Sequence, residues 1–310
     1  MESVEVIMER SQVFIGTGGW EHDVLDQCLY PQSGMTSNQK LAYYARFFGT
    51  TEVRATFWDE SIAAADARGW AEAVEGRHDF LFNVKLHKAF THKRELHSSM
   101  AKNIRGVLQE LARHNKLGAL LLQFPYGFTN TGAGRQHLVK LAELFRGFPL
   151  HVELRHESWQ SSGLMSFLEE HGLHPVSVDL PKIRQYIPYL TGVVGDTAYL
   201  RLHGRNEKGW LLNGIDARYD YLYNSREISE IRRRIEALAG RCRRIMLICN
   251  NTTGGKAVAN ALQLSHALNG KTSHAIPRSA FRVFPSLQEI GVPEDDQQRL
   301  FDAPGLRSVI

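Results

Sequence analysis

Acidic and basic residues stand two positions apart at the ends of several short apolar runs in this chain. Glu153 and Arg155 form one such pair, and Arg201 and His203 form another. Because side chains alternate across a β-strand, residues two apart point to the same face. Each pair therefore offers one acid–base group and one cation on the same side. This is typical of sites where one side chain moves a proton while a cation holds an anionic group.

Eight apolar runs end on a polar or charged residue, and stretches with helical periodicity lie between most of them. The runs cover residues 13–16, 51–54, 80–85, 119–123, 150–155, 175–179, 198–203 and 245–250. A strand–helix unit that repeats eight times predicts a (β/α)8 TIM barrel, whose working residues lie at the C-terminal ends of the strands. We therefore expect the polar strand ends to meet at one barrel mouth.

Two groups of side chains are predicted at this mouth. The candidate acid–base residues are Glu52, Glu153, Asp179, His203 and His92. The candidate substrate-binding residues carry positive charge, amide groups or aromatic rings and are Trp20, Lys85, Gln123, Arg155, His156, Trp159, Arg201, Asn250 and Asn251. The residues expected to share a single cleft are Glu52, Lys85, Glu153, Arg155, Asp179, Arg201 and His203.

Positive charge exceeds negative charge at the predicted mouth. The carboxylates there are Glu52, Glu153 and Asp179, whereas the cations are Arg54, Lys85, Arg155 and Arg201, and the basic segment 85–96 adds to them. Burying this much positive charge is costly, so a bound anion would relieve it. Two interpretations remain open: a ligand site, or a network of ion pairs without a function.

The sequence lacks the motifs that usually announce a metal or a nucleophile. HExxH and GxSxG are absent, and the three cysteines do not have metal-ligand spacing. A divalent metal assembled from Glu52, Glu153, Asp179 and His203 is possible, but the neighbouring arginines and lysine would repel it. We therefore predict no cofactor and no metal. For the loop of residues 250–255, phosphate binding on its amides and capping of the next helix both remain open.

Helices are expected in most gaps between the strands. Ser37 and Ser225 are predicted N-caps, and the last barrel helix is expected over about residues 256–268. Residues 179–195 are expected to be irregular, because Pro181 and Pro188 interrupt any helix there.

Length and composition bound the class of protein. The 310 residues are 43% hydrophobic and 23% charged with a net charge of +4, which fits a folded globular chain and forces no partner. The domains predicted are an N-terminal arm (1–12), the barrel (13–270) and a C-terminal extension (271–310) that is docked on the barrel or flexible.

The cellular location is also an expectation from sequence. The strongly apolar stretch 117–125 is too short to span a bilayer, and two early glutamates argue against a secretory signal. An odd number of cysteines (Cys28, Cys242 and Cys249) indicates free thiols in a reducing compartment. We expect a cytoplasmic protein that does not interact with membranes.

The same segments resemble the YecE-like family, whose domain is called domain of unknown function seventy-two. The matching pieces run in unbroken order and include Gly16-Thr17-Gly18-Gly19-Trp20, Glu52 with residues 53–57, Lys85 with Thr91-His92, Gln123-Phe124-Pro125, Glu153-Leu154-Arg155-His156 with Ser158-Trp159, Asp179 with Pro181, Arg201-Leu202-His203-Gly204, and Asn250-Asn251 with Asn260-Ala261. The resemblance spans residues 13 to about 268. It implies a TIM barrel and no established reaction.

Two positions depart from the pattern of that family. Gly18 stands where the family usually has serine, and Arg54 stands where it usually has asparagine. The first change removes a hydroxyl from the first loop, and the second adds a cation at the end of the second strand.

Two functions remain open. The first is an enzyme that uses acid–base chemistry on an anionic substrate, either a phosphorylated sugar or a compound derived from nucleic acid. The second is a non-catalytic binder of nucleic acid or of a phosphorylated metabolite, which would use the basic rim and aromatic rings. Convergent carboxylates favour the enzyme, since a pure anion binder gains nothing from them.

Overall fold

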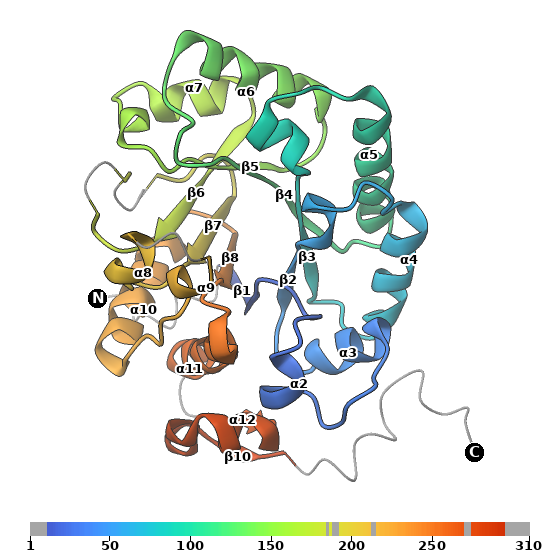
Figure 1. The fold of residues 1–310 in the computed structure, drawn as a ribbon, viewed down its shortest axis with the longest axis vertical. Helices are drawn as coiled ribbons and strands as arrows, with labels where there is room; N and C mark the ends of the chain where they lie inside the picture. Colours follow the sequence, from blue (N-terminus) through green and yellow to red (C-terminus); the bar gives the residue numbers. More distant parts are fainter. Residues whose placement is uncertain (1–10, 184–185, 188–191, 212–214, 270–273, 295–310) are drawn as a thin grey trace.

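Eight parallel strands close into a barrel surrounded by helices (Figure 1). The computed structural model describes residues 11–183, 186–187, 192–211, 215–269 and 274–294. The (β/α)8 TIM barrel predicted from sequence is therefore confirmed. Of the predicted N-terminal arm, residues 1–10 lie outside the described residues, and Gln12 already begins the first strand.

The strands follow one another around the barrel in sequence order. They are β1 (Gln12–Thr17), β2 (Thr50–Val53), β3 (Leu81–Lys85), β4 (Leu117–Gln123), β5 (Leu150–Glu153), β6 (Leu173–Asp179), β7 (Thr197–Leu202) and β8 (Arg244–Cys249). The barrel closes where β1 pairs in parallel with β8. Each predicted apolar run overlaps one of these strands.

Helices cover the outside of the barrel and fill most strand connections. They are α2 (Leu25–Cys28), α3 (Ser37–Tyr44), α4 (Ala64–Ala73), α5 (Ser98–Arg113), α6 (Gly132–Leu144), α7 (Leu164–Glu170), α8 (Glu207–Leu211), α9 (Ile215–Arg218), α10 (Ser225–Ala239) and α11 (Lys256–Asn269). In Figure 1, α3, α4 and α5 flank β2 to β4, while α10 and α11 lie on the other side. Between β6 and β7 the described residues contain no helix, as the two prolines predict.

Side-chain alternation on β7 separates the barrel interior from the outer core. Tyr199 and Arg201 both bond to Glu52 of β2, which is not a neighbouring strand, so their side chains cross the interior. Leu200 and Leu202 alternate with them and are buried on the other face, toward the helices. The polar residues Tyr199 and Arg201 of β7 therefore point inward toward Glu52.

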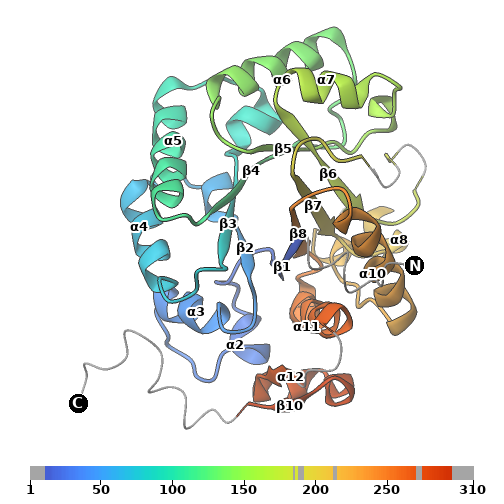
Figure 2. The same ribbon diagram turned by 180° about the vertical axis from the view of Figure 1, so that it is seen from behind.

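Residues 274–294 form a small unit on the outer side of α11 (Figures 1 and 2). It contains β9 (His274–Ile276), α12 (Arg278–Val283), η5 (Pro285–Glu289) and β10 (Gly291–Pro293), and β9 pairs in parallel with β10. Phe284 and Leu287 are buried in the common core. Residues 295–310 of the predicted extension lie outside the described residues.

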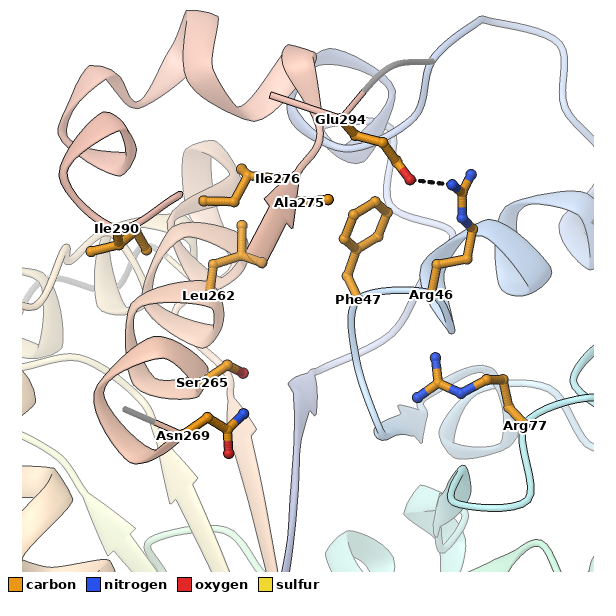
Figure 3. A pocket seen from close by; sticks show the side chains of 10 residues that line it. All are labelled: Arg46, Phe47, Arg77, Leu262, Ser265, Asn269, Ala275, Ile276, Ile290 and Glu294. Carbon is orange, nitrogen blue, oxygen red and sulfur yellow. Dashed lines mark hydrogen bonds and ion pairs between the residues drawn. The ribbon is translucent and has the colours of Figure 1, made fainter. Parts of the chain in front are cut away.

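A cavity of about 400 Å³ lies between this unit, α11 and the segment that joins α3 to β2. Figure 3 shows Ile276 and Ile290 on one side and Phe47 on the other, with an ion pair between Arg46 and Glu294 at its edge. The guanidinium of Arg77 is already bound to Asp79. This cavity lies away from the C-terminal strand ends, because its residues come from the segments before β2 and β3, from α11 and from the residues after α11.

None of the described helices combines the length and the apolar character needed to cross a membrane.

Candidate functional site

A buried group of charges lies inside the barrel where β2, β5 and β7 end. The Nε of Arg201 donates to Glu52 Oε2 at 2.7 Å and its Nη2 to Glu52 Oε1 at 2.8 Å, while its Nη1 donates to Glu153. Arg155 Nε donates to Glu153 Oε1 at 2.7 Å. We call Glu52, Glu153, Arg155 and Arg201 the ion cluster. The structure thus brings together four predicted residues from three strands.

Glu153, Arg155 and Arg201 keep their charges at neutral pH. Burial alone would raise the pKa of Glu153, but Arg201 and Arg155 hold it well below its usual range. Burial opposes the charge of Arg201 too, yet Glu153 and Glu52 raise its pKa well above normal. Glu153 is therefore a weak base that carries no proton, and its geometry suits it to holding two arginines in place.

Asn250 connects the ion cluster to His203. Its Oδ1 accepts from Arg201 Nη2 at 3.4 Å, and its Nδ2 donates to His203 Nδ1 at 2.9 Å. This pairing leaves the proton of a neutral imidazole on Nε2, which lies 3.5 Å from Glu153 Oε1. Burial lowers the pKa of His203 to about 4 in spite of Glu153. His203 is thus a neutral side chain with its N–H directed to the cluster.

Lys85, the last residue of β3, forms no ion pair with any residue that the structure describes. Within the described part of the chain its Nζ has no hydrogen-bond partner, and it lies 3.9 Å from the centre of the Phe57 ring in η1 (Ala55–Phe57). Burial and the nearby Arg201 lower the pKa of Lys85 to about 7, although Glu52 acts in the opposite direction. The side chain is only partly buried, so a ligand can reach its amine.

His92 lies on the rim beside Lys85. It belongs to η2 (Ala89–Lys93), its ring is exposed, and its centre is 5.0 Å from that of Phe57. Partial loss of solvation, followed by the charges of Lys85 and Arg155, lowers the pKa of His92 to about 4. Because both cations act on this imidazole, we place Lys85, His92 and Arg155 in one neighbourhood.

Hydrogen-bond donors without acceptors line the β7 side of the mouth. The centre of the Trp210 ring in α8 lies 5.6 Å from the guanidinium of Arg155 and 5.9 Å from that of Arg218. Trp210 Nε1 and Arg218 Nε are buried, and no described residue accepts a hydrogen bond from them. Of the Arg155 nitrogens, only Nε has a protein partner among the described residues. A ligand rich in acceptors would satisfy these donors.

Aromatic rings continue this wall outward. Tyr186 lies 5.4 Å from Trp210 and is stacked on Tyr126 at 4.7 Å, and Tyr126 in turn lies 5.0 Å from His156. His156 Nδ1 also accepts from the Ser158 amide at 3.1 Å, which caps η3 (Glu157–Trp159). His156 is thus a rim residue whose position is set by its own loop.

Asp179 does not join the ion cluster, and the prediction of a single shared cleft is wrong for this residue. Its carboxylate accepts from Arg205 at 2.7 and 2.8 Å, from Arg234 of α10 at 2.7 Å and from Tyr223 at 2.9 Å. The reason is the alternation of side chains along β6. His174 stacks on the interior His151 and so faces inward, whereas Asp179, five positions later, faces outward. Asp179 lines a cavity of about 670 Å³ with Arg205 and Arg234, and Tyr186 of the aromatic wall also borders it.

Trp20 and Trp159 pack behind the barrel wall and do not face the mouth. Trp20 contacts Trp70 and Phe82 edge-on at 5.9 and 6.2 Å. Trp159 is fully buried and donates from Nε1 to the Phe128 carbonyl at 2.7 Å. Both predicted binding roles are therefore corrected: these loops return to the barrel exterior and use their indoles for packing.

The two remaining amide residues differ in position. Gln123 pairs in register with Glu153 and so faces the same side, where its Nε2 donates to the Phe124 carbonyl at 2.7 Å. Asn251 is fully buried and donates to Asn260 of α11 and to the Tyr221 carbonyl, each at 2.8 Å. It joins α11 to the segment before α10 and is not available at the mouth.

The strand ends alone do not point to Arg218 or to the role of Phe57. Arg218 follows Trp210 within the long connection between β7 and α10, where α8 and α9 interrupt the simple strand–helix pattern. A loop of unusual length that carries tryptophan, arginine and tyrosine is the signal available in the sequence. Among the residues that the structure describes, no group of three or more His, Cys, Asp or Glu side chains is arranged to hold a metal ion.

Fold and site together define a (β/α)8 barrel protein with a buried ion cluster and a donor-rich rim at the C-terminal mouth. Comparison with protein families matches residues 14–282 to the family described as protein of unknown function DUF72. The chain belongs to this family, which confirms the resemblance to the YecE-like group.

Relatives match this chain along almost their whole length. The UPF0759 protein YunF of Bacillus subtilis is 28% identical over 285 residues, which are 86% of this chain and 98% of that protein. A DUF72 family protein from Thermotoga maritima has a TM-score of 0.73 and 29% identity, covering 84% of this chain and 100% of its own. One from Enterococcus faecalis, 24% identical, has a TM-score of 0.73 over 86% of this chain and 99% of its own.

Proposed function

We propose that this protein is an enzyme that acts by acid–base chemistry on a small anionic substrate, a phosphorylated sugar or a compound derived from nucleic acid, at the C-terminal mouth of the barrel. The observation that carries this proposal is the surplus of donors there. Trp210 Nε1, Arg218 Nε and the terminal nitrogens of Arg155 have no acceptor in the described residues, because both interior carboxylates are already engaged by arginines. A phosphate or carboxylate group supplies the missing acceptors.

The proposed roles follow from which groups can change their protonation. Glu153 and Arg201 hold fixed charges, and together with the buried Glu52 they set the electrostatic field of the site. Lys85 and His92 are the accessible titratable groups beside the cluster, and proton transfer is assigned to them. His203 contributes a neutral N–H donor. The proposed chemistry uses no metal. We also propose a cytoplasmic location, which the three free cysteines support.

A second candidate, a non-catalytic binder, is supported by one observation on the rim. Trp58 is 63% exposed, and Lys88 Nζ lies 4.6 Å from its ring centre. An exposed indole beside a lysine is a platform on which a nucleic-acid base stacks. This alternative predicts tighter binding of single-stranded RNA or DNA than of phosphate, with a strong dependence on salt.

The binding half of the proposal is tested by thermal unfolding in the presence of inorganic phosphate and of sugar phosphates. Binding to the folded state raises stability by RT ln(1 + [L]/Kd), about 2.7 kcal/mol at a hundredfold excess over Kd. The informative variant is Trp210→Phe, which keeps a ring and removes one donor, and the matched control is Arg232→Met on the exposed face of α10. We expect a smaller ligand-induced shift in Trp210→Phe and an unchanged one in the control. Equal shifts in all three proteins would place the anion elsewhere.

The catalytic half is tested by turnover of the ligands found in this way. Lys85→Met should lose turnover by about 10²–10⁴-fold if Lys85 transfers a proton. Retained binding with full turnover in Lys85→Met would contradict the assignment. Tight binding without turnover of any phosphorylated compound, together with preferential binding of single strands, would favour the binder.

A further inference from the structure

We infer that the side-chain amine of Lys85 is a nucleophile that forms a covalent imine with a carbonyl carbon of the substrate. The inference rests on the proposed function, because it concerns the same anionic substrate and adds that it carries an aldehyde or ketone group. The substrate class is then a small carbonyl compound with a phosphate or carboxylate group. The reaction class is bond breaking or proton exchange at the carbon next to that carbonyl.

Geometry isolates the Lys85 amine and keeps it accessible. The residue ends β3, one of the inward-facing positions of the barrel, and its Nζ is positioned over the face of Phe57 at 3.9 Å. Throughout the described chain no carboxylate or hydroxyl binds this Nζ. A lysine that served only as a structural cation would be expected to pair with Glu52 or Glu153. Arg201 occupies both of those carboxylates instead.

The surrounding charges favour a neutral amine. The charged and titratable groups that face Lys85 are Glu52 and Arg54 from the β2 side, His92 from η2, Glu153 from β5 and Arg201 from β7. Arg201 and Arg155 already pair with the two carboxylates, so a protonated Lys85 would add a positive charge that no carboxylate of the cluster balances. Burial and Arg201 accordingly bring the pKa of Lys85 to about 7. Desolvation beside another cation is a known means of making a lysine amine nucleophilic.

The covalent step balances without an oxidant or a reductant. The lone pair of the neutral Lys85 nitrogen adds to the carbonyl carbon and forms a C–N bond, and the carbonyl oxygen takes up a proton. Loss of one nitrogen proton gives a neutral carbinolamine. Protonation of its hydroxyl then lets the nitrogen lone pair form the C=N bond while the C–O bond breaks and water leaves, and the nitrogen keeps its second proton. The product is an iminium ion, and addition of water reverses the sequence. The iminium withdraws electrons from the adjacent carbon, which is what activates that carbon.

The same surroundings accept the charge of the iminium once substrate is bound. The iminium is positive, and the ion cluster alone would disfavour it. A phosphate or carboxylate held by Arg155 and Trp210 brings the compensating negative charge, and the Phe57 face lies beside the cationic nitrogen. The imine is therefore expected with anionic carbonyl compounds and much less with neutral ones.

The test is reductive trapping of the full chain at pH 7. Wild-type protein is incubated with glycolaldehyde phosphate or, as the uncharged control, glycolaldehyde, in the presence of cyanoborohydride, which reduces an imine to a stable secondary amine. Peptide mass spectrometry then compares labelling of Lys85 with labelling of the exposed Lys102. With a pKa of about 7, about half of Lys85 is neutral at this pH, so labelling should be at least about tenfold faster than at Lys102.

The outcomes separate this inference from the proposed function. Preferential labelling of Lys85 by glycolaldehyde phosphate, and its absence in a folded Lys85→Arg variant, supports the imine. Labelling of Lys85 no faster than Lys102 in a protein that phosphate still stabilises overturns the imine and leaves the proposed function standing. Equal labelling of Lys85 by both aldehydes contradicts the requirement for an anion. If phosphate does not stabilise the protein and Lys85 is not labelled, both the imine and the proposed function are refuted. The comparison of Lys85 with Lys102 is made in the wild-type protein, so it does not depend on the folding of any variant.

Discussion

Arg201 binds the carboxylates of two different strands, and at the scale of single residues the site depends on it. The Arg201→Met variant would leave Glu52 and Glu153 buried without their main partner. We expect the free energy of unfolding to fall by about 3–5 kcal/mol, the usual cost of breaking a buried ion pair on one side. Urea unfolding measures this. In Arg232→Met, which removes an exposed pair with Glu236, the loss should stay within about 1 kcal/mol. Similar losses in the two variants would mean that the cluster is not the support we describe.

Lys85 should also leave a signature in the pH dependence of stability. Its pKa is about 7 in the folded protein against an ordinary value of 10.5, so between these values the unfolded state binds more protons. Stability therefore rises with pH over this window, and the charged amine destabilises the fold below about pH 7. The free energy of unfolding of wild type minus that of Lys85→Met should increase from pH 7 to pH 9. A difference that stays flat across this range would show that Lys85 titrates normally.

At the scale of elements, the sequence predicts that the charged ends of β5 and β7 face the barrel interior. It does not predict which way the end of β6 faces. On β5 and β7 the charged residues alternate with leucine and valine, so polarity separates the two faces. On β6 both faces are buried: Val176 and Val178 point inward and Asp179 outward, so polarity does not indicate which face is the interior. The same ambiguity applies to Trp20 and Trp159, because an aromatic ring after a strand can pack outside the barrel as well as line its mouth.

The starts of α3 and α10 were predicted one residue too late, because two adjacent residues at each start can serve as the N-cap. The N-caps are Thr36 and Asn224, one residue before the predicted Ser37 and Ser225. Each forms a capping box with a residue three positions later, Gln39 and Glu227 respectively, and the serines are the first residues inside the helices. The reciprocal bond to Gln39 or Glu227 decides between two adjacent cap-forming residues.

The loop after β1 is an element whose shape controls Asn250. A Cβ on Gly18 would lie 2.5 Å from Asn250 Oδ1, and Arg54 Nη1 donates to the Gly18 carbonyl at 3.3 Å. The two departures from the YecE-like pattern are thus in contact. Gly18→Ala should displace Asn250, lower stability by about 1–3 kcal/mol and weaken phosphate binding. Gly127→Ala, whose Cβ would meet nothing within 4 Å, is the control. Thermal shifts report both effects, and identical behaviour of the two variants would refute this reading of the loop.

At the scale of the whole molecule, residues 274–294 are part of the same folded body as the barrel. Leu287 is fully buried beside α11, whereas Val292 is 55% exposed. Leu287→Ala should lower the free energy of unfolding by about 2–5 kcal/mol with one cooperative transition. Val292→Ala should change it by about 0.5 kcal/mol or less. A separate early transition in Leu287→Ala would instead mean that this segment unfolds on its own.

An anion held at the mouth by Arg155 and Trp210 is the central claim, and locating that anion in a crystal tests it most directly. Arsenate is suitable because it mimics phosphate and scatters anomalously. We predict an anomalous peak at the C-terminal end of the barrel, with arsenate oxygens about 3 Å from Trp210 Nε1 and from a terminal nitrogen of Arg155. An empty mouth at saturating arsenate, or arsenate only at other surfaces while protein atoms satisfy these donors, would contradict the claim.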